Sequence, residues 1–266
     1  MYKTFYSLST TPFSKELKHT EAFESTPFRE ASAALNYVKG IRGMGLLTGE
    51  AGAGKTLALR AFAESLNPSL YKVMYFPLST GTVMDFYRGL AVGLGEEAKN
   101  RKVDLFMQIQ QAVMTLYHQR KITPIFILDE MQFAKDAFLH DLNMIFNFNM
   151  DSLNPFVLIL SGLPFLQDRL LLNPNRPLNG RLVMRMKMEP LNKEEVAGYI
   201  QHHMQRAGAR HPIFTESAME AITSCSQGWP RVINNLAIHA LIHGCESKKE
   251  QIDAEIIRHV ADGLRL

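Results

Sequence analysis

The stretch from Gly45 to Arg60, GLLTGEAGAGKTLALR, constrains the fold more than any other part of the chain. A short apolar run breaks at a glycine-rich turn that ends in lysine and threonine, and a helical apolar pattern follows. Glycines permit positive φ angles, so the backbone N–H groups of such a turn can converge on an anion. A helix that begins directly after the turn adds the positive end of its dipole. We therefore predict a strand, a phosphate-binding loop and a helix, in this order.

The spacing within this stretch is Gly49-x-x-x-x-Gly54-Lys55-Thr56, the full Walker A pattern. Lys55 is expected to reach the β- and γ-phosphates, and the hydroxyl of Thr56 to ligate Mg²⁺. The alternative is a chance glycine turn, which the position between a strand and a helix disfavours. The predicted nucleotide-binding residues of the loop are Gly49, Glu50, Ala51, Gly52, Ala53, Gly54, Lys55, Thr56 and Leu57.

Such a site also needs an acid at the end of another buried strand, and the run Ile125–Glu130, IFILDE, supplies two. Asp129 is predicted to hold the Mg²⁺ shell, as Walker B acids do. Glu130 is predicted to polarise the water that attacks the γ-phosphate, which is a general-base role. The alternative is that both carboxylates only cap the strand end. An acid next to the Walker B aspartate favours an ATP-hydrolysing machine over a small GTPase or a P-loop kinase.

Nothing in the sequence indicates specificity for guanine. The nearest match to Asn-Lys-x-Asp is the segment 192–195, Asn-Lys-Glu-Glu, which is better explained as a helix cap. We therefore predict ATP, with Mg²⁺, as the cofactor.

Strand-like and helix-like runs alternate from about residue 40 to residue 190. The strand-like runs are GMGLLT (43–48), YKVMYFPL (71–78), PIFILDE (124–130), PFVLILSG (155–162) and VMRMKM (183–188). Helical apolar spacing occurs in Lys55–Ser65, Val83–Leu94, Asp104–Arg120, Asp136–Asn149 and Pro164–Leu172. This alternation predicts an α/β fold with a parallel five-stranded sheet and helices on both faces. With the Walker A motif, the expected fold is of the P-loop NTPase kind. The last strand alternates methionine with basic residues, which predicts an edge position.

After Pro190 the strand-like runs stop and helix signals follow. The predicted helix starts are an Asn192/Glu195 capping box, an N-cap at Thr215, a first-turn proline at Pro230 and an N-cap at Asp253. We therefore predict two domains: a nucleotide-binding α/β domain over residues 1–190 and a small all-helical lid over residues 191–266.

The composition places few limits on function. The 266 residues suffice for one or two domains, and 46% hydrophobic and 21% charged residues argue against global disorder. A net charge of +3 permits contact with nucleic acid without requiring it. Cys225 and Cys245 lack metal-type spacing and are expected to be free thiols. No secretory signal and no apolar stretch of about 20 residues is visible, so we expect a cytoplasmic protein without membrane contact.

Taken together, these motifs resemble those of AAA+ ATPases, in the branch that contains the secretion-type ExeA proteins and the transposon ATPases of the TnsC, TniB and IstB kind. The Walker motifs are generic, whereas the segment Gly228-Trp229-Pro230-Arg231-x-x-Asn234-x-Leu236 is more discriminating. Other supporting segments are Phe5-Tyr6, Pro12-Phe13, Leu142–Ser152, Ser161-Gly162 and Leu178–Arg181. The resemblance covers nearly the whole chain and implies an AAA+ domain followed by a sensor-2 lid.

The resemblance implies roles for two polar residues near the phosphates. Ser161, at the end of the fourth strand, is similar to the sensor-1 group, although relatives often have Gly-Gln-Pro where this chain has Gly162-Leu163-Pro164. Arg231 resembles the sensor-2 arginine, which reaches from the lid to the phosphates of the same subunit. The alternative for Arg231 is an exposed arginine at a helix start.

The resemblance also implies a group that acts on a neighbouring subunit. Arg181 resembles an arginine finger, which contributes about 10³–10⁵ in rate when it reaches the γ-phosphate. Arg176 and Arg185 are rival candidates, and a surface salt bridge is the alternative role for Arg181. A finger implies a homo-oligomer, either a ring or a filament. The predicted catalytic residues are therefore Glu130, Lys55, Arg181, Ser161 and Arg231.

The N-terminal segment has two interpretations. The resemblance implies that Pro12-Phe13 and the region of Phe23 wrap the adenine. The alternative is that its aromatic rings only attach the segment to the core.

The use of ATP is less well indicated. Because the chain has the size and layout of the transposon ATPases, we expect assembly on double-stranded DNA as a target-selection factor for a transposase. Candidate phosphate contacts are Lys99, Arg101 and Lys102, with Ser79, Thr80 and Thr82; a solvated charge run is the alternative. The second hypothesis is a cytoplasmic ATPase switch that acts on a protein partner, such as a secretion machine. A third is a P-loop kinase for a small molecule.

Overall fold

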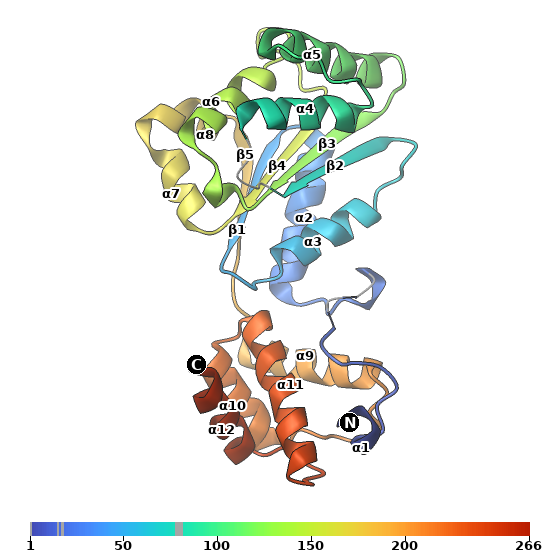
Figure 1. The fold of residues 1–266 in the computed structure, drawn as a ribbon, viewed down its shortest axis with the longest axis vertical. Helices are drawn as coiled ribbons and strands as arrows, with labels where there is room; N and C mark the ends of the chain where they lie inside the picture. The colour runs from blue at the N-terminus through green and yellow to red at the C-terminus, as the bar shows by residue number, and fades with distance from the viewer. Residues whose placement is uncertain (1, 15, 17–18, 78–81) are drawn as a thin grey trace. The chain divides into compact units, whose positions relative to one another are not determined.

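The structure, a computed structural model, describes residues 2–14, 16, 19–77 and 82–266 (Figure 1). Packing divides the chain into two compact units. The α/β unit consists of Glu30–Glu50 and Lys55–Lys187, and the helical unit consists of Met1–Arg29, Ala51–Gly54 and Met188–Leu266. The predicted domains are continuous segments, whereas the helical unit also contains two segments from the N-terminal half of the chain.

A five-stranded sheet in the order β2-β3-β4-β1-β5 forms the centre of the α/β unit. Its strands are β1 (Met44–Gly49), β2 (Tyr71–Pro77), β3 (Thr123–Asp129), β4 (Val157–Gly162) and β5 (Leu182–Met188). The pairs β2·β3, β3·β4 and β4·β1 are parallel. All residues of β1 and β4 are buried, as expected for strands covered on both faces. The predicted fold class is confirmed, and β5 lies at the edge as its alternating pattern predicts.

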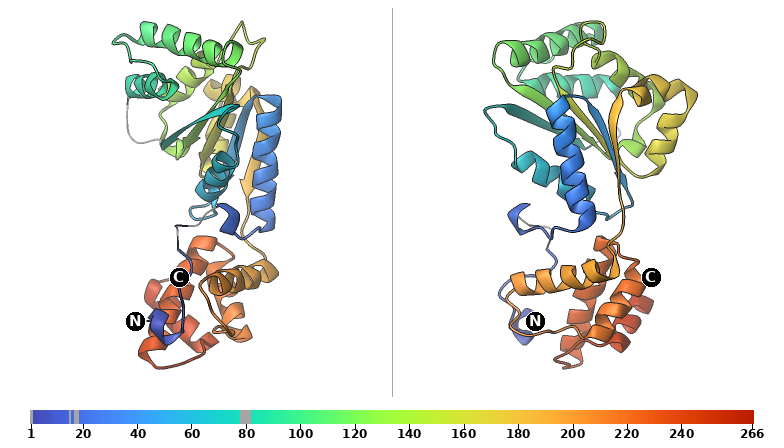
Figure 2. Two further views of the ribbon diagram at one scale, coloured as in Figure 1. Left: turned by 90° about the vertical axis from the view of Figure 1, so that its right-hand side faces the viewer. Right: turned by 180° about the vertical axis from the view of Figure 1, so that it is seen from behind.

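Helices cover both faces of this sheet. They are α2 (Thr26–Ile41), whose first turn belongs to the helical unit, α3 (Lys55–Glu64), α4 (Val83–Leu94), α5 (Lys102–His118), α6 (Asp136–Ile145), α7 (Phe165–Leu171) and α8 (Arg176–Gly180). Two short 3₁₀ helices, η2 (Met131–Phe133) and η3 (Asn173–Asn175), complete the connections. Helix α2 lies on one face of the sheet, and α4, α5 and α6 lie on the other (Figure 2).

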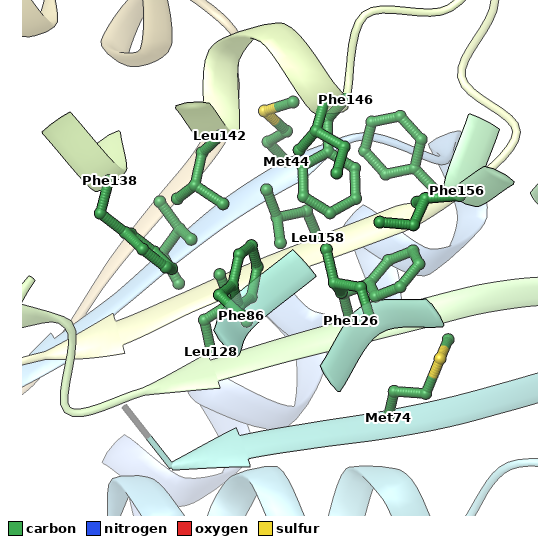
Figure 3. Packing of buried hydrophobic residues seen from close by; sticks show 14 of the residues in the cluster. Met44, Met74, Phe86, Phe126, Leu128, Phe138, Leu142, Phe146, Phe156 and Leu158 are labelled. Carbon is green, nitrogen blue, oxygen red and sulfur yellow. The ribbon is translucent and has the colours of Figure 1, made fainter. Parts of the chain in front are cut away.

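The core beneath α4, α5 and α6 is aromatic, and it supports the carboxyl end of β3. Phe126 and Leu128 point to the same face of β3, because side chains two residues apart on a strand share a face. The ring of Phe126 packs edge-on against Phe146, with centroids 5.0 Å apart (Figure 3). Phe86 of α4 and Phe138 of α6 lie with ring centroids 4.5 Å apart. This packing holds β3 in place up to the residue before Asp129.

Some helix assignments from the sequence differ from the structure. Helices α1 (Tyr2–Phe5), α2 and α8 are not among the predicted helices, and α5 begins and ends two residues earlier than the predicted Asp104–Arg120. Helix α6 ends at Ile145, four residues before the predicted Asn149. The reason is local, since Asn149 and its two successors have positive φ, and Phe148 forms an isolated antiparallel bridge with Leu153.

The helical unit contains α9 (Lys193–Arg206), α10 (Glu216–Ser226), α11 (Pro230–Glu246) and α12 (Ala254–Leu264). Their starts are as predicted. Asn192 and Glu195 form a capping box, and the side chains of Thr215 and Asp253 accept hydrogen bonds from the backbone N–H groups of Ala218 and Ile256. The core between these helices includes Val196, Ile200, Ile222, Ile233, Leu236, Leu241 and Ile257.

The N-terminal segment, with α1 (Tyr2–Phe5) and η1 (His19–Glu21), packs on the helical unit. Tyr6, Leu8 and Phe13 are buried in its core. The ring of Phe13 stacks on His203 of α9, with centroids 5.1 Å apart. Aromatic attachment, the second interpretation of this segment, thus describes its packing, although onto the helical unit, and a role at the adenine stays a prediction.

Two further expectations concern single features. Cys225 and Cys245 are free thiols, as predicted. Within the part of the chain that the structure describes, no helix is both long and apolar enough to cross a membrane.

Candidate functional site

The glycine-rich loop joins β1 to α3 as predicted. β1 ends at Gly49, α3 begins at Lys55, and Gly52 and Gly54 have positive φ angles of 89° and 100°. A side chain is disfavoured at such angles, so the glycines are required by the backbone. The ammonium of Lys55 donates to the carbonyl oxygens of Gly49 at 2.8 Å and Glu50 at 3.0 Å. The lysine is buried and lies against its own loop, at the start of a helix.

Asp129, the last residue of β3, collects four hydrogen bonds. Its Oδ1 accepts from the hydroxyl of Ser161 at 2.7 Å and from the backbone N–H of Glu130 at 3.0 Å. Its Oδ2 accepts from the hydroxyl of Thr56 at 3.0 Å and from that of Tyr75 at 3.1 Å. Asp129 is buried, with 1% of the residue exposed. Three of the predicted site residues, Thr56, Asp129 and Ser161, are therefore brought together by one carboxylate.

Glu130 follows immediately and is exposed. Its φ of 58° places its backbone in the left-handed region. The amide of Gln132 donates from Nε2 to Oε2 of Glu130. The Oε1 atom of the same amide accepts from the backbone N–H of Leu163 at 3.1 Å. Gln132 therefore joins the predicted general base to the loop that follows Ser161.

The oxygen-rich donor set suits Mg²⁺. Hydroxyl and carboxylate oxygens are the ligands that this ion prefers, and it usually takes only one or two protein groups together with phosphate oxygens. The hydroxyl of Thr56 and the carboxylate of Asp129 are already within hydrogen-bond distance. Among the described residues no group of three or more His, Cys, Asp or Glu side chains is placed to hold a metal ion. Thr56 and Asp129 are the two residues that would hold the ion.

Arg231 lies in the first turn of α11, within the helical unit. Its backbone N–H donates to the carbonyl oxygen of Gly52 at 3.3 Å. A Cβ atom placed on Gly52 would come within 2.3 Å of the Cβ of Arg231. The glycine-rich loop is thus in direct contact with the residue that the sequence predicts as sensor 2, whose role stays a prediction.

The three arginine-finger candidates differ in what they contact. Arg181 donates to the carbonyl oxygens of Asn143 at 3.1 Å and Phe146 at 2.6 Å, and it pairs with Asp151 at 2.8 Å. Burial lowers the pKa of its guanidinium, and the charge of Asp151 opposes that shift. Acting on a neighbour would require Arg181 to leave these three partners.

Arg185 and Arg176, the two other finger candidates, differ in whether their guanidinium groups have partners. Arg185 donates to Leu182 and Asn179 of its own chain. Arg176 is exposed and has no hydrogen-bond or ion-pair partner among the described residues. Of the three, Arg176 is the one whose guanidinium needs no release before it binds another group.

Known proteins resemble this chain in sequence and in fold. The profile of a family described as AAA domain matches residues 39–170. General secretion pathway protein A of Aeromonas hydrophila is 29% identical over 271 residues, and the match covers 100% of this chain and 49% of that protein. The chain therefore spans about half the length of this curated relative.

Solved structures extend the comparison to the whole fold. Cdc6p of Pyrobaculum aerophilum superposes with a TM-score of 0.69 at 13% identity, over 93% of this chain and 69% of that one. The Orc1 protein of Aeropyrum pernix, solved in complex with DNA, gives 0.62 at 16% identity, over 95% and 67%. The fold is that of an AAA+ P-loop NTPase. At these identities the likeness concerns the AAA+ fold alone.

The predicted resemblance is confirmed in its coarser part. The AAA domain and the similarity to a secretion-type protein are found, whereas none of these comparisons points to the transposon ATPases.

The structure describes only some of the candidate DNA contacts. Ser79 and Thr80 lie outside the described residues. Thr82 caps α4, and Lys102 forms an ion pair of 2.6 Å with the buried Asp141. Lys102 is therefore occupied by a contact within the α/β unit.

Tyr75 and Gln132 contact the two acids, and the sequence reasoning missed both. Tyr75 belongs to the apolar run of β2, and no motif distinguishes it. Burial, reinforced by the charge of Asp129, raises the pKa of its phenol to about 12. The usable signal for Tyr75 was a hydroxyl near the end of a strand, but strand neighbours cannot be read from local sequence. The signal for Gln132 was an amide two residues after Glu130.

Proposed function

We propose that this chain binds ATP together with Mg²⁺ and hydrolyses the ATP. The observation that carries the proposal is the 3.0 Å hydrogen bond from Thr56 to Asp129, at the start of α3 and the end of β3. It joins the hydroxyl and the carboxylate that would share the ion. Held by these two groups, Mg²⁺ would supply positive charge that stabilises the negative charge developing on the phosphates. Residues Gly49 to Leu57 would hold the phosphates, with Lys55 and Arg231 as the cationic contacts.

Glu130 is the proposed general base. It is exposed at the end of a rigid strand, one residue after Asp129, so a water molecule can reach its carboxylate. A positioned general base contributes about 10²–10⁴ in rate. Ser161 holds the carboxylate of Asp129 and is proposed to sense the γ-phosphate from that position.

Hydrolysis is proposed to need a homo-oligomer, because an arginine from a neighbouring subunit completes sites of this kind. Arg181, our first candidate from the sequence, is held by three partners in its own chain. Arg176 is now the better candidate, since it is exposed and unpartnered among the described residues. ATPase activity should then rise faster than linearly with protein concentration, and a strictly linear dependence would count against an oligomer.

The ATPase is proposed to act on one of two kinds of partner. The similarity to General secretion pathway protein A supports an ATPase switch that acts on a protein partner. The likeness to an Orc1 protein solved with DNA supports double-stranded DNA as the second candidate. Assembly on DNA with a transposase was our expectation from the sequence, and it has no support from the relatives described above. We therefore favour the protein partner.

Nucleotide binding and hydrolysis are tested together with two variants. Binding of a labelled ATP is measured with and without Mg²⁺, and phosphate release is measured separately. Lys55→Ala should weaken binding itself, whereas Glu130→Gln should retain binding and lose hydrolysis. Failure of the wild-type protein to bind ATP in the presence of Mg²⁺ would remove the proposal. Equal turnover by wild type and Glu130→Gln would remove Glu130 from its role.

The client is tested by a gel-shift on non-specific duplex DNA at low salt, with a slowly hydrolysed ATP analogue. A nucleotide-dependent shift favours DNA. The absence of any shift, combined with ATPase activity, favours a protein partner.

A further inference from the structure

We propose that Tyr75 is a positioning residue that holds Asp129 in place for Mg²⁺, so that it sets the magnesium dependence of nucleotide binding. This inference rests on the proposed function. Its starting point is the 3.1 Å hydrogen bond from the phenol of Tyr75 to Oδ2 of Asp129.

The strand register explains why a tyrosine can make this contact. In the parallel pair β2·β3, Asp129 lies opposite Pro77, and Tyr75 lies two residues earlier, opposite Ile127. Two residues of a parallel strand span about 6.6 Å, at about 3.3 Å per residue. The long tyrosine side chain covers that distance, whereas a serine or threonine at the same position is too short. The contact with Asp129 therefore requires both the β2·β3 register and a side chain as long as that of tyrosine.

The four donors around Asp129 are not equivalent. An ionised carboxylate has about four acceptor positions, and here four donors fill them. Thr56 is the proposed ligand of the ion itself, so its hydroxyl has a second function. On Oδ2, the only other donor among the described residues is Tyr75. Tyr75 is thus the dedicated donor that fixes the orientation of this oxygen.

The alternative role of Tyr75, as a side chain that only packs in the core, does not account for its contact with Asp129. Tyr75 is 47% exposed as a whole residue, and it forms no aromatic ring pair with the described residues. The hydroxyl makes no other hydrogen bond within the described part of the chain. Hydrogen-bond partners of metal-binding carboxylates typically change metal affinity or activity by 10–100-fold when they are removed. Loss of this hydroxyl should therefore be measurable in metal dependence.

The chain offers a matched control on the same strand. Tyr71 lies four residues before Tyr75 on the same face of β2, at the opposite end of the strand. Its ring lies beneath the ammonium of Lys39, an interaction that phenylalanine keeps, and its hydroxyl has no hydrogen-bond partner among the described residues. Tyr71→Phe therefore removes the same atom from the same strand without touching Asp129.

The experiment titrates Mg²⁺ against the binding of a fluorescent, slowly hydrolysed ATP analogue to wild type, Tyr75→Phe and Tyr71→Phe. We expect Tyr75→Phe to raise the Mg²⁺ concentration at half-maximal binding by about 10-fold. Affinity in EDTA and the midpoint of Tyr71→Phe should stay at the wild-type values. Mn²⁺ binding followed by electron paramagnetic resonance should show the same order, and melting curves report folding.

Three results would overturn the inference alone. They are a midpoint within twofold of wild type in Tyr75→Phe, an equal shift in Tyr71→Phe, and an equally large loss of affinity in EDTA. Failure of the wild-type protein to bind the analogue at all would overturn the proposed function as well, so the two failures are distinguishable.

Discussion

Gln132 donates a hydrogen bond from its side-chain amide to the carboxylate of Glu130, two residues before it. The same amide accepts from the backbone N–H of Leu163, in the loop after β4. A Cβ atom on Gly162 would lie 2.8 Å from this amide oxygen, so glycine keeps the path open. One side chain thus connects the predicted base with the loop that follows Ser161.

Gln132→Ala should lower kcat by roughly 10-fold while leaving nucleotide affinity near the wild-type value. The reason is that Glu130 loses its orientation, and a positioned base contributes about 10²–10⁴ in rate. Gln167→Ala, on the nearby α7, is the control because that side chain has no hydrogen-bond partner among the described residues. Steady-state phosphate release distinguishes the outcomes. An unchanged kcat in Gln132→Ala contradicts the prediction.

Gly52→Ala should abolish nucleotide binding and destabilise the protein. The substitution introduces a side chain at a φ of 89° and brings its Cβ within 2.3 Å of Arg231. Gly40→Ala is the matched control, because a Cβ there meets nothing within 4 Å and the residue lies in α2. Replacing a helical glycine should stabilise by roughly 0.5–1 kcal/mol. Melting curves measure the stability of the two variants, and labelled ATP measures their nucleotide binding. Wild-type ATP binding by Gly52→Ala would contradict the prediction.

Glu195→Ala should destabilise the helical unit by about 1–2 kcal/mol. Its carboxylate caps two helices, since Oε2 accepts from the N–H of Asn192 at 3.2 Å and Oε1 from that of Thr26 at 2.6 Å. Removing it leaves both N–H groups without this partner. The exposed neighbour Glu194 serves as the control, and Glu194→Ala should change stability by less than about 0.5 kcal/mol. Denaturant unfolding provides the comparison, and equal effects of the two changes would argue against the double cap.

Arg181→Ala should lower stability by about 1–3 kcal/mol, because the guanidinium joins two carbonyl oxygens at the end of α6 to Asp151. Arg176→Ala should leave stability within about 0.5 kcal/mol of wild type, since that side chain is exposed. Thermal unfolding measures this difference. A loss of ATPase activity in Arg176→Ala at unchanged stability supports a finger role, whereas unfolding of Arg176→Ala would contradict the assignment of this residue to the surface.

Stability should fall as the pH drops below about 6.5. Burial, together with the charge of Arg206 and neighbouring His202, lowers the pKa of His203 from 6.5 to about 3. Between these values the unfolded chain binds a proton at this position that the folded chain does not. The contribution of neutral His203 to the free energy of unfolding is therefore fully present above pH 6.5. It is lost as the pH falls towards 3, by up to about 1.4 kcal/mol per pH unit.

His203→Phe tests this dependence because it retains a ring against Phe13 and removes the titrating group. Thermal unfolding at several pH values between 7.5 and 5 should show a shallower loss in the variant. The exposed His211 supplies the control, and His211→Ala should keep the wild-type slope. Identical slopes in wild type and His203→Phe would assign the acid sensitivity to other groups.

Local sequence patterns were enough for the fold class and for half of the site. The glycine spacing requires a particular loop conformation, and the apolar run before Asp129 requires a buried strand, so both could be predicted without knowledge of distant residues. The helix caps at Asn192, Thr215 and Asp253 are likewise decided within four residues. Each of these features depends on interactions between near neighbours in the chain.

The remaining features depend on which segments become neighbours in space. Tyr75 reaches Asp129 only because β2 pairs with β3 in one register, and Arg181 is occupied only because the end of α6 and Asp151 lie beside it. Met1–Arg29 belongs to the same compact unit as Met188–Leu266, although the two segments are far apart in the sequence. Residue spacing within a segment was therefore enough to predict the glycine-rich loop and the strand before Asp129. Strand order, register and long-range packing decided which side chains contact Asp129 and Glu130.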